Sequence, residues 1–276
     1  MNLTVIIATS QQRTEWLISR SLLSVYNQLN IDKQKCKILI IDDNEVRTEF
    51  AKIKDEIQHL RDNKKLKSKE FSTTVLRNKR TPFMSGTGAW NTGIFESHKQ
   101  HPEGYISILD DDDEYLPYHL FNCVNSISKN TIAIFQRLLW KNEDSTIMNL
   151  DLTKDKLVAL NFFVGNPGVQ GSNMFFKTQS LINIGGFDET LPNTTDRDLM
   201  IRFLWKYSNQ QIKVLETIGV IHYNHKYPKV NSNIPLKQQG LDLFYKKYRA
   251  HFAADSYQKS LIRAKKYFNY IPIEER

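Results

Sequence analysis

Residues 105–117 read YISILDDDDEYLP, an apolar run that ends in four consecutive aspartates and a glutamate. Two carboxylates about 4 Å apart repel by about 1 kcal/mol in water and by several times more near a protein surface. Such a cluster destabilises a fold unless a charge of opposite sign offsets it. The stretch therefore predicts a buried strand that carries a cation site at its carboxyl end.

The spacing of the aspartates indicates which kind of cation they would hold. Side chains of an extended segment alternate between two faces, so Asp110 and Asp112 are expected on one face and Asp111 and Asp113 on the other. Carboxylate oxygens suit Mg²⁺ or Mn²⁺, which proteins usually hold by one or two carboxylates, with phosphate oxygens and water completing the shell. A solvated acidic turn and a calcium loop are the alternatives. Because the stretch lacks the glycine of a D-x-D-x-D-G calcium loop, it favours a metal that also binds nucleotide phosphates.

The segments that precede this strand predict an α/β fold. Short apolar runs rich in β-branched residues alternate with segments whose apolar residues recur at helical spacing. We expect strands at 3–9, 37–44, 72–78 and 105–113, and helices at 15–29, 47–62 and 85–98. This alternation predicts a mostly parallel sheet with right-handed crossovers, which binds its ligand at the carboxyl ends of the strands.

The segments that follow the aspartates indicate a mixed second half. Strands are expected at 131–140, 145–150, 171–178 and 213–224, with a helix at 194–207 and two amphipathic helices within the last forty residues. We therefore predict one domain over residues 1–236. It would comprise a nucleotide-binding half (1–115) and an acceptor half (116–236), followed by a helical extension (237–276).

Composition limits the classes of protein that remain. The 276 residues are 40% hydrophobic, which supports a sizeable core, and no run approaches the ~18 apolar residues of a membrane span. The first residues lack the pattern of a secretory signal, so we expect a cytoplasmic protein. Cys36 and Cys123 lack partners at metal-ligand spacing and are expected to be buried free thiols.

The formal net charge of +8 favours an anionic partner. A phosphate-bearing substrate, an anionic membrane surface and nucleic acid are the candidates, and nucleic acid is disfavoured because no recognition motif accompanies the charge. The lysines and aromatic residues of the last forty residues fit two interpretations. They fit helices that pack on the main domain, and they also fit peripheral contact with the inner face of the cell membrane.

Seven segments together resemble family 2 glycosyltransferases of the GT-A fold. They are VIIATSQQR, SLLSVYNQ, KILIIDD, GAWNTGI, YISILDDDDEYLP, GGFDETL and TTDRDL, in this order, and the resemblance covers roughly residues 3–225. It implies a Rossmann-like, mostly parallel sheet flanked by helices. It also implies an inverting enzyme that uses a nucleotide-diphosphate sugar and a Mn²⁺ or Mg²⁺ ion bound at a D-x-D motif.

The resemblance also implies roles for individual residues. The expected nucleotide-sugar contacts are Thr9, Arg13, Asp42, Asp43, Arg80, Asn91, Asp110 and Asp111. The expected metal ligands are Asp112, Asp110 and His225. A histidine after the last core strand often completes the metal site in this family, and His225 matches that position better than His222.

TTDRDL resembles the acidic pair of the family whose aspartate serves as the catalytic base. Asp196 falls on that aspartate, but Thr195 precedes it where the family usually has glutamate. Alternatively, Thr194 or Thr195 caps a helix whose N-terminal dipole Asp196 complements. In GGFDE, Gly186 and Asp188 are expected on the acceptor side.

Together these observations predict a metal-dependent, inverting glycosyltransferase. It would move a hexose or N-acetylhexosamine from a UDP-sugar to a glycan or lipid-linked acceptor. The Q-x-x-R-W signature of processive polymer synthases is absent from the sequence, which favours the addition of one sugar at a time. The alternatives are a metal-dependent nucleotidyltransferase and a basic nucleic-acid- or membrane-binding module with a vestigial metal site.

Overall fold

The computed structural model describes residues 1–62, 71–82, 85–142, 144, 147–149, 151–224, 234–273 and 276. The strands are β1 (Leu3–Thr9), β2 (Cys36–Asp42), β3 (Ser72–Arg77), β4 (Tyr105–Asp110), β5 (Glu114–Tyr115), β6 (Ala133–Asn142), β7 (Ile147–Asn149), β8 (Met174–Lys177) and β9 (Ile212–Asn224). The helices are α1 (Thr14–Trp16), α2 (Leu23–Tyr26), α3 (Arg47–Asp62), α4 (Thr87–Gln100), α5 (His119–Asn125), α6 (Ala159–Val164), α7 (Thr178–Ile182), α8 (Thr195–Lys206), α9 (Ile234–Tyr248) and α10 (Ala254–Phe268). A π-helical segment, Leu17–Leu22, joins α1 to α2.

The described strands form one sheet in the order β3-β2-β1-β4-β8-β6-β9-β5, with β7 paired to β6. The pairs β3–β2, β2–β1 and β1–β4 are parallel, whereas β4–β8 and β8–β6 are antiparallel. The predicted α/β class, with a parallel first half and a mixed second half, is confirmed. The short elements β5, α5, α6 and α7 were not predicted, because each is too brief to show a periodic pattern.

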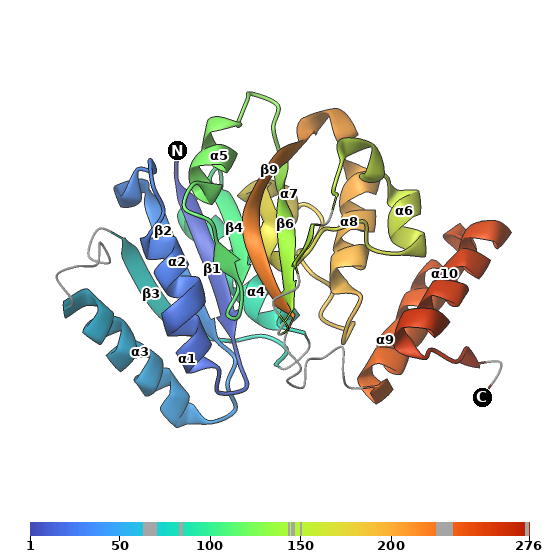
Figure 1. Cartoon of the computed structure of the whole chain (residues 1–276), viewed down its shortest axis with the longest axis horizontal. Coiled ribbons are helices and arrows are strands. Elements are labelled where there is room, and N and C mark those ends of the chain that lie inside the picture. The colour runs from blue at the N-terminus through green and yellow to red at the C-terminus, as the bar shows by residue number, and fades with distance from the viewer. Residues whose placement is uncertain are drawn as a thin grey trace.

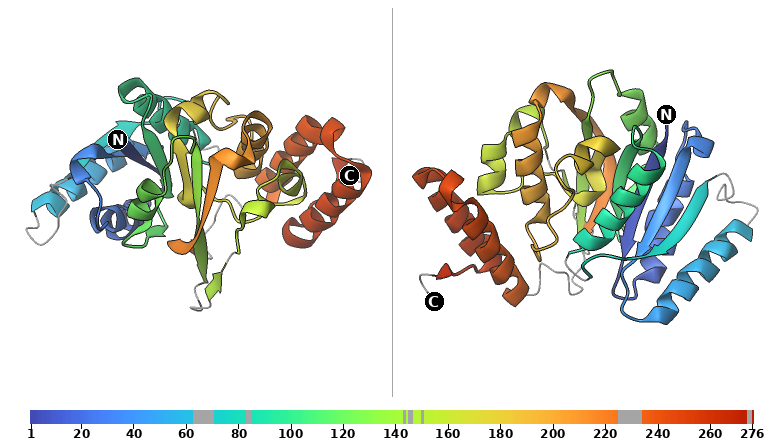
Figure 2. Two further views of the ribbon diagram at one scale, coloured as in Figure 1. Left: turned by 90° about the horizontal axis from the view of Figure 1, so that it is seen from above. Right: turned by 180° about the vertical axis from the view of Figure 1, so that it is seen from behind.

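Both faces of the sheet are covered by helices, so its central strands are apolar on both sides (Figures 1 and 2). In β1, Val5 and Ile7 pack in one core cluster with residues of α2, α3 and α5. Ile6 faces the opposite cluster, which contains residues of α4, α7 and α8. Because consecutive side chains point to opposite faces, one unbroken apolar run serves both cores.

The C-terminal helices belong to the second of these clusters. Leu241 and Phe244 of α9 and Ala264 of α10 lie in the same buried cluster as Phe203 of α8. The two helices lie beside α8 at one end of the sheet (Figure 1). The predicted boundary after residue 236 falls inside α9, which begins at Ile234.

Cys36 and Cys123 are buried free thiols, as expected. Burial raises the pKa of the Cys36 thiol to about 12, so it stays protonated at neutral pH. Among the described residues, no helix combines the length and the apolar character that a bilayer crossing requires.

Candidate active site

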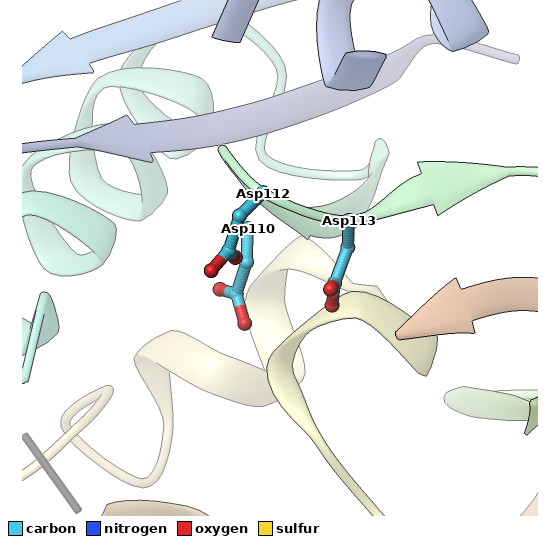
Figure 3. Close-up of side chains that lie close together, drawn as sticks. All are labelled: Asp110, Asp112 and Asp113. Carbon is cyan, nitrogen blue, oxygen red and sulfur yellow. The ribbon is translucent and has the colours of Figure 1, made fainter. Parts of the chain in front are cut away.

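The acidic stretch forms a tight turn at the carboxyl end of the central strand β4. The strand ends at Asp110, and the backbone N–H of Asp113 donates to the carbonyl oxygen of Asp110 (3.2 Å). As a result, carboxylate oxygens of Asp110, Asp112 and Asp113 lie within 4.8 Å of one another (Figure 3). The expected alternation between two faces was therefore wrong for Asp113, because the chain turns after Asp110 instead of staying extended.

Asp111 is not a member of this trio and pairs with Arg13. Its Oδ1 lies 2.9 Å from Nη2 of Arg13, while Nη1 of the same arginine lies 3.5 Å from Oδ2 of Asp112. The turn is also held by its backbone, since Arg20 donates to the carbonyl oxygen of Asp112 (2.7 Å) and Ser21 to that of Asp111 (3.3 Å). The segment that follows β1 thus fixes the position of the turn.

Asp113 has several hydrogen-bond partners among the described residues. Its carboxylate accepts hydrogen bonds from the Ser172 hydroxyl (2.5 Å) and the Tyr223 backbone (3.1 Å), and it lies 3.0 Å from Nδ1 of His222. Burial alone would raise the pKa of Asp113, but His222 and these hydrogen bonds lower it. Ser172 also accepts from the backbone N–H of Asp110 (3.0 Å), so it ties both ends of the turn together.

Asp110 and Asp111 resist ionisation. Burial, followed by the charges of Asp113, Asp112 and Asp196, raises the pKa of Asp110 well above its usual range. Burial likewise raises the pKa of Asp111 to about 7, although Arg13 opposes the shift. Clustered carboxylate oxygens are the ligands that a hard divalent cation prefers, so Asp110, Asp112 and Asp113 fit such an ion.

Asp196 lies across from this turn, in the first turn of α8. Its Oδ1 is buried and has no hydrogen-bond partner among the described residues. Burial raises its pKa to about 7, while Lys237 and His222 act to lower it. The carboxyl group is thus poised near neutral pH, which suits a general base.

The backbone before Asp196 is strained. Thr194 has a φ of +61°, in the left-handed region that a β-branched residue rarely adopts. It makes no side-chain cap for α8, and its hydroxyl donates instead to the carbonyl oxygen of Asn193. The helix-capping alternative for Thr194 is therefore wrong. Strain of this kind costs about 1–3 kcal/mol and is found mostly at functional sites.

Three of the residues expected at the nucleotide, Thr9, Asp42 and Asp43, lie at the carboxyl ends of β1 and β2. The backbone N–H of Asp43 donates to the carbonyl oxygen of Thr9 (2.8 Å), which joins the two strand ends. The carboxylate of Asp42 is bound by Arg77 (2.5 Å) and Asn44 (2.7 Å). These side chains line the same edge of the sheet as the acidic turn, since β1 lies between β2 and β4 (Figure 1).

Arg80, which follows β3, and Asn91 of α4 contact the GGFDE loop (residues 185–189). Both pair with Glu189, and Asn91 also donates to the carbonyl oxygen of Phe187 (2.9 Å). Gly186 has a φ of +68°, and a Cβ at this position would come within 2.3 Å of the Asn91 amide oxygen. A side chain is excluded there for both reasons. Nucleotide contact by Arg80 and Asn91 stays a prediction.

The GGFDE loop borders a polar cavity of about 360 Å³. Its lining consists of Arg80, Asn91, Gly185, Phe187, Asp188, Glu189, Arg202 and Lys247. Asp188 pairs with Lys247 of α9 (2.6 Å), and although its partial burial opposes ionisation, the hydrogen bonds from Lys247 and Thr190 lower its pKa to about 2. Asp188 is therefore charged throughout the neutral range.

His225 lies outside the described residues, so its expected metal contact stays a prediction. His222 instead contacts the acidic turn through Asp113. Sequence reasoning missed Ser172, Arg20 and Lys237 altogether. None of them belongs to a motif that indicates a functional site, and only the folded structure brings them near the turn or Asp196.

The fold and the acidic turn define the chain as a glycosyltransferase of GT-A type. The model of the family described as glycosyl transferase family 2 matches residues 4–185, and the chain belongs to this family. Among curated proteins, none matches the sequence.

Solved structures support the same fold. The chain is similar to S. aureus TarS 1–349, with a TM-score of 0.63 and 14% identity over 97% of this chain and 72% of that one. The complex of TarS 1–349 with UDP-GlcNAc has a TM-score of 0.62 and 12% identity over 97% of this chain and 80% of that one. The mannosyltransferase PcManGT from Pyrobaculum calidifontis was solved in complex with GDP-Man and Mn²⁺. It has a TM-score of 0.58 and 17% identity over 97% of this chain and 69% of that one.

Proposed function

We propose that this protein is a metal-dependent, inverting glycosyltransferase that adds one sugar at a time. The donor would be a nucleotide-diphosphate sugar, a UDP-hexose or UDP-N-acetylhexosamine, and the acceptor a hydroxyl of a glycan or a lipid-linked molecule. The observation that carries the proposal is the trio Asp110, Asp112 and Asp113, whose carboxylate oxygens lie within 4.8 Å of one another at the carboxyl end of β4. Two fold neighbours were solved with UDP-GlcNAc or with GDP-Man and Mn²⁺, which supports the same ligand class.

The residues around the turn would bind two parts of the donor, its diphosphate and its nucleoside. Asp110 and Asp112 would hold the divalent ion, with Asp113 fixed behind them by Ser172 and His222. When bound, the ion would neutralise the charge that develops on the departing diphosphate. Arg13 lies beside these carboxylates and would direct its guanidinium to the phosphates, while Thr9, Asp42 and Asp43 would border the nucleoside.

Asp196 would act on the acceptor. An alcohol becomes a better nucleophile when a carboxylate accepts its proton as the new bond forms, and the raised pKa of Asp196 makes the carboxylate a stronger base than a solvated aspartate. Attack from the side opposite the diphosphate inverts the anomeric centre. The acceptor would approach along the GGFDE loop, where Asp188 stays charged and can hydrogen-bond a sugar hydroxyl.

The first experiment is a panel of nucleotide sugars, including UDP-N-acetylglucosamine and GDP-mannose, assayed with Mn²⁺ for binding and slow hydrolysis. We expect one donor to stand out and to release a nucleoside diphosphate. Asp112→Ala should lower metal-dependent turnover by at least about 100-fold, because a lost ligand weakens the ion at the diphosphate.

Asp55→Ala is the matched control, since Asp55 is exposed on α3. It should behave as the native protein in the same assay. Undiminished turnover of Asp112→Ala would refute the metal site. Release of pyrophosphate in place of nucleoside diphosphate would indicate a nucleotidyltransferase.

A further inference from the structure

Asn44 links the loop after β1 to the loop after β2. Its side-chain Oδ1 accepts a hydrogen bond from the backbone N–H of Gln12 (2.7 Å). Its Nδ2 donates to Oδ1 of Asp42 (2.7 Å), and its backbone N–H donates to the same oxygen (3.1 Å). Asn44 is only 2% exposed, and Asp42 is fully buried. One buried side chain therefore joins two loops across a separation of 32 residues in the sequence.

The amide of Asn44 suits this position because it carries a donor and an acceptor in one plane. Turning the amide over would place its nitrogen against the N–H of Gln12 and its oxygen against the carboxylate of Asp42. Both contacts would then be repulsive, so the surroundings select one orientation. An aspartate in the same place would keep the acceptor for Gln12 but would set a second carboxylate against Asp42.

The loop after β1 has a strained backbone. Gln11 and Gln12 both lie in the left-handed region, with φ of +55° and +57°. Residues other than glycine rarely adopt this conformation, and it persists where surrounding contacts hold it. Both glutamines are exposed, so burial of their side chains contributes little to holding the loop. The hydrogen bond from the N–H of Gln12 to Asn44 therefore stabilises the left-handed conformation.

The two loops that Asn44 joins carry groups proposed to bind the donor. The left-handed loop leads directly into Arg13, whose guanidinium lies 2.9 Å from Asp111. On the other side, Asn44 and Arg77 each bind one oxygen of the Asp42 carboxylate (2.7 and 2.5 Å). Asn44 thus connects a group proposed for the diphosphate with a group proposed for the nucleoside.

We propose that Asn44 is a positioning residue for the nucleotide part of the donor. By holding Gln12 and Asp42 at the same time, it sets the position of the Arg13 loop relative to the Asp42 carboxylate before the nucleotide binds. A site whose groups are already in place binds more tightly, because less ordering is left for the ligand to impose. This inference rests on the proposed function of Arg13 and Asp42 as donor contacts.

The test compares Asn44→Ala and Asn44→Asp in the full chain. Alanine removes both side-chain hydrogen bonds, whereas aspartate keeps the shape and the acceptor for Gln12 but loses the donor to Asp42. Isothermal calorimetry with UDP and with GDP, each with Mn²⁺, measures the Kd of the nucleotide that the native protein binds. We expect this Kd to rise at least about tenfold in both variants, since a hydrogen bond to a charged group is lost.

The binding of Mn²⁺ alone provides an internal comparison. Its Kd, measured by electron paramagnetic resonance, should stay within about twofold of the native value in both variants, because the Asn44 side chain acts on the nucleotide loops. Asn130→Ala and Asn130→Asp make the same two changes in an exposed turn and should match the native protein in every assay.

Steady-state kinetics with the donor identified by the panel separates positioning from a general loss of stability. The KM for the donor should rise at least about tenfold while kcat stays within about threefold, because Asn44 acts on binding groups. A partly unfolded protein would instead lose kcat at an unchanged KM. A folded Asn44→Ala protein with the native Kd and KM would overturn the proposal. A folded Asn44→Asp protein with the native Kd would do the same, because it lacks the donor to Asp42.

A further readout needs no nucleotide. Hydrogen exchange at the Gln12 amide, followed by NMR, should be faster in Asn44→Ala than in the native protein, because the amide loses its acceptor. Equal exchange rates would contradict the link between the two loops. If the native protein binds neither UDP nor GDP and turns over no nucleotide sugar, the proposed function fails. The exchange rate still decides whether Asn44 holds the loop.

Discussion

At the scale of single residues, the site depends on carboxyl groups whose surroundings push their pKa values in different directions. His222 and Ser172 favour the ionised form of Asp113, whereas burial and the neighbouring carboxylates favour the protonated form of Asp110. Divergent environments for neighbouring carboxyl groups assign them different roles. In the proposed function, Asp113 supports the turn, Asp110 and Asp112 would be ligands of the ion, and Asp196 of α8 would be the base.

Asp196→Asn tests the role of the base. The amide cannot accept a proton, so turnover should fall by at least about 100-fold while the Kd for the donor with Mn²⁺ stays unchanged. In the native protein turnover should rise with pH through about 7, because the carboxyl group must lose its proton before it can act. Isothermal calorimetry and the pH profile of donor turnover measure the two effects.

Asp255→Asn makes the same change in the first turn of α10, at an exposed side chain, and should leave turnover intact. Undiminished transfer by Asp196→Asn would remove Asp196 from the role of base.

At the scale of elements, the sequence predicted the strands well because a strand covered on both faces must be apolar throughout. β1, β2 and β4 lie where their apolar runs indicate, and the acidic residues follow them at the expected edge. The turn at Asp110 could not be predicted in the same way. Its geometry is set by Ser172 and by the carbonyl contacts of Arg20 and Ser21, all distant in the sequence.

The first residue of α5 provides a test at this scale. His119 is buried, its Nδ1 lies 2.9 Å from the Gln136 side-chain oxygen, and its ring packs against Tyr115 at 4.1 Å. Gly219 leaves the necessary space, since a Cβ there would lie 2.5 Å from Nδ1 of His119. Burial lowers the pKa of His119 to about 4, although the hydrogen bond that the ring donates to the Gln136 side-chain oxygen opposes the shift.

The sign of the pH effect follows from this shift. Below its unfolded pKa of about 6.5, His119 takes up a proton in the unfolded chain but not in the folded one, so acid favours unfolding. The free energy of unfolding should fall by about 3 kcal/mol between pH 6.5 and 4 because of this group, and not at all above pH 7.

Urea denaturation of the native protein and of His119→Gln, whose side chain does not titrate, measures the difference at each pH. His251→Gln at an exposed position is the control. Parallel stability curves for the native protein and His119→Gln between pH 4 and 6.5 would contradict the assignment.

At the scale of the whole molecule, the C-terminal helices and the main sheet share one core. Leu241 and Phe244 lie in the same buried cluster as Phe203, and Arg197 stacks on Phe244 with its guanidinium 4.1 Å from the ring centroid. The sequence favoured packing of these helices on the main domain and left membrane contact open. The packing is confirmed, and membrane contact stays a prediction.

Tyr248→Phe tests how much the polar part of this interface contributes to stability. The variant removes one donor from the fully buried carboxylate of Asp198, so the free energy of unfolding should fall by about 1–3 kcal/mol. Tyr267→Phe, at a side chain that is 61% exposed, should change it by less than about 0.5 kcal/mol. Urea denaturation at pH 7 compares the two variants. Equal losses in the free energy of unfolding would contradict a stabilising role for the hydrogen bond between Tyr248 and Asp198.

The sequence by itself determined where the main strands lie along the chain, the carboxyl-end edge where the acidic residues gather, and the family. These features are local, because an apolar run followed by carboxylates can be recognised from the sequence alone. Only the tertiary structure decided which carboxylates face one another and that His222 supports Asp113. Those pairings join residues far apart in the chain, and a charge acts through space over a few ångströms whatever the sequence separation.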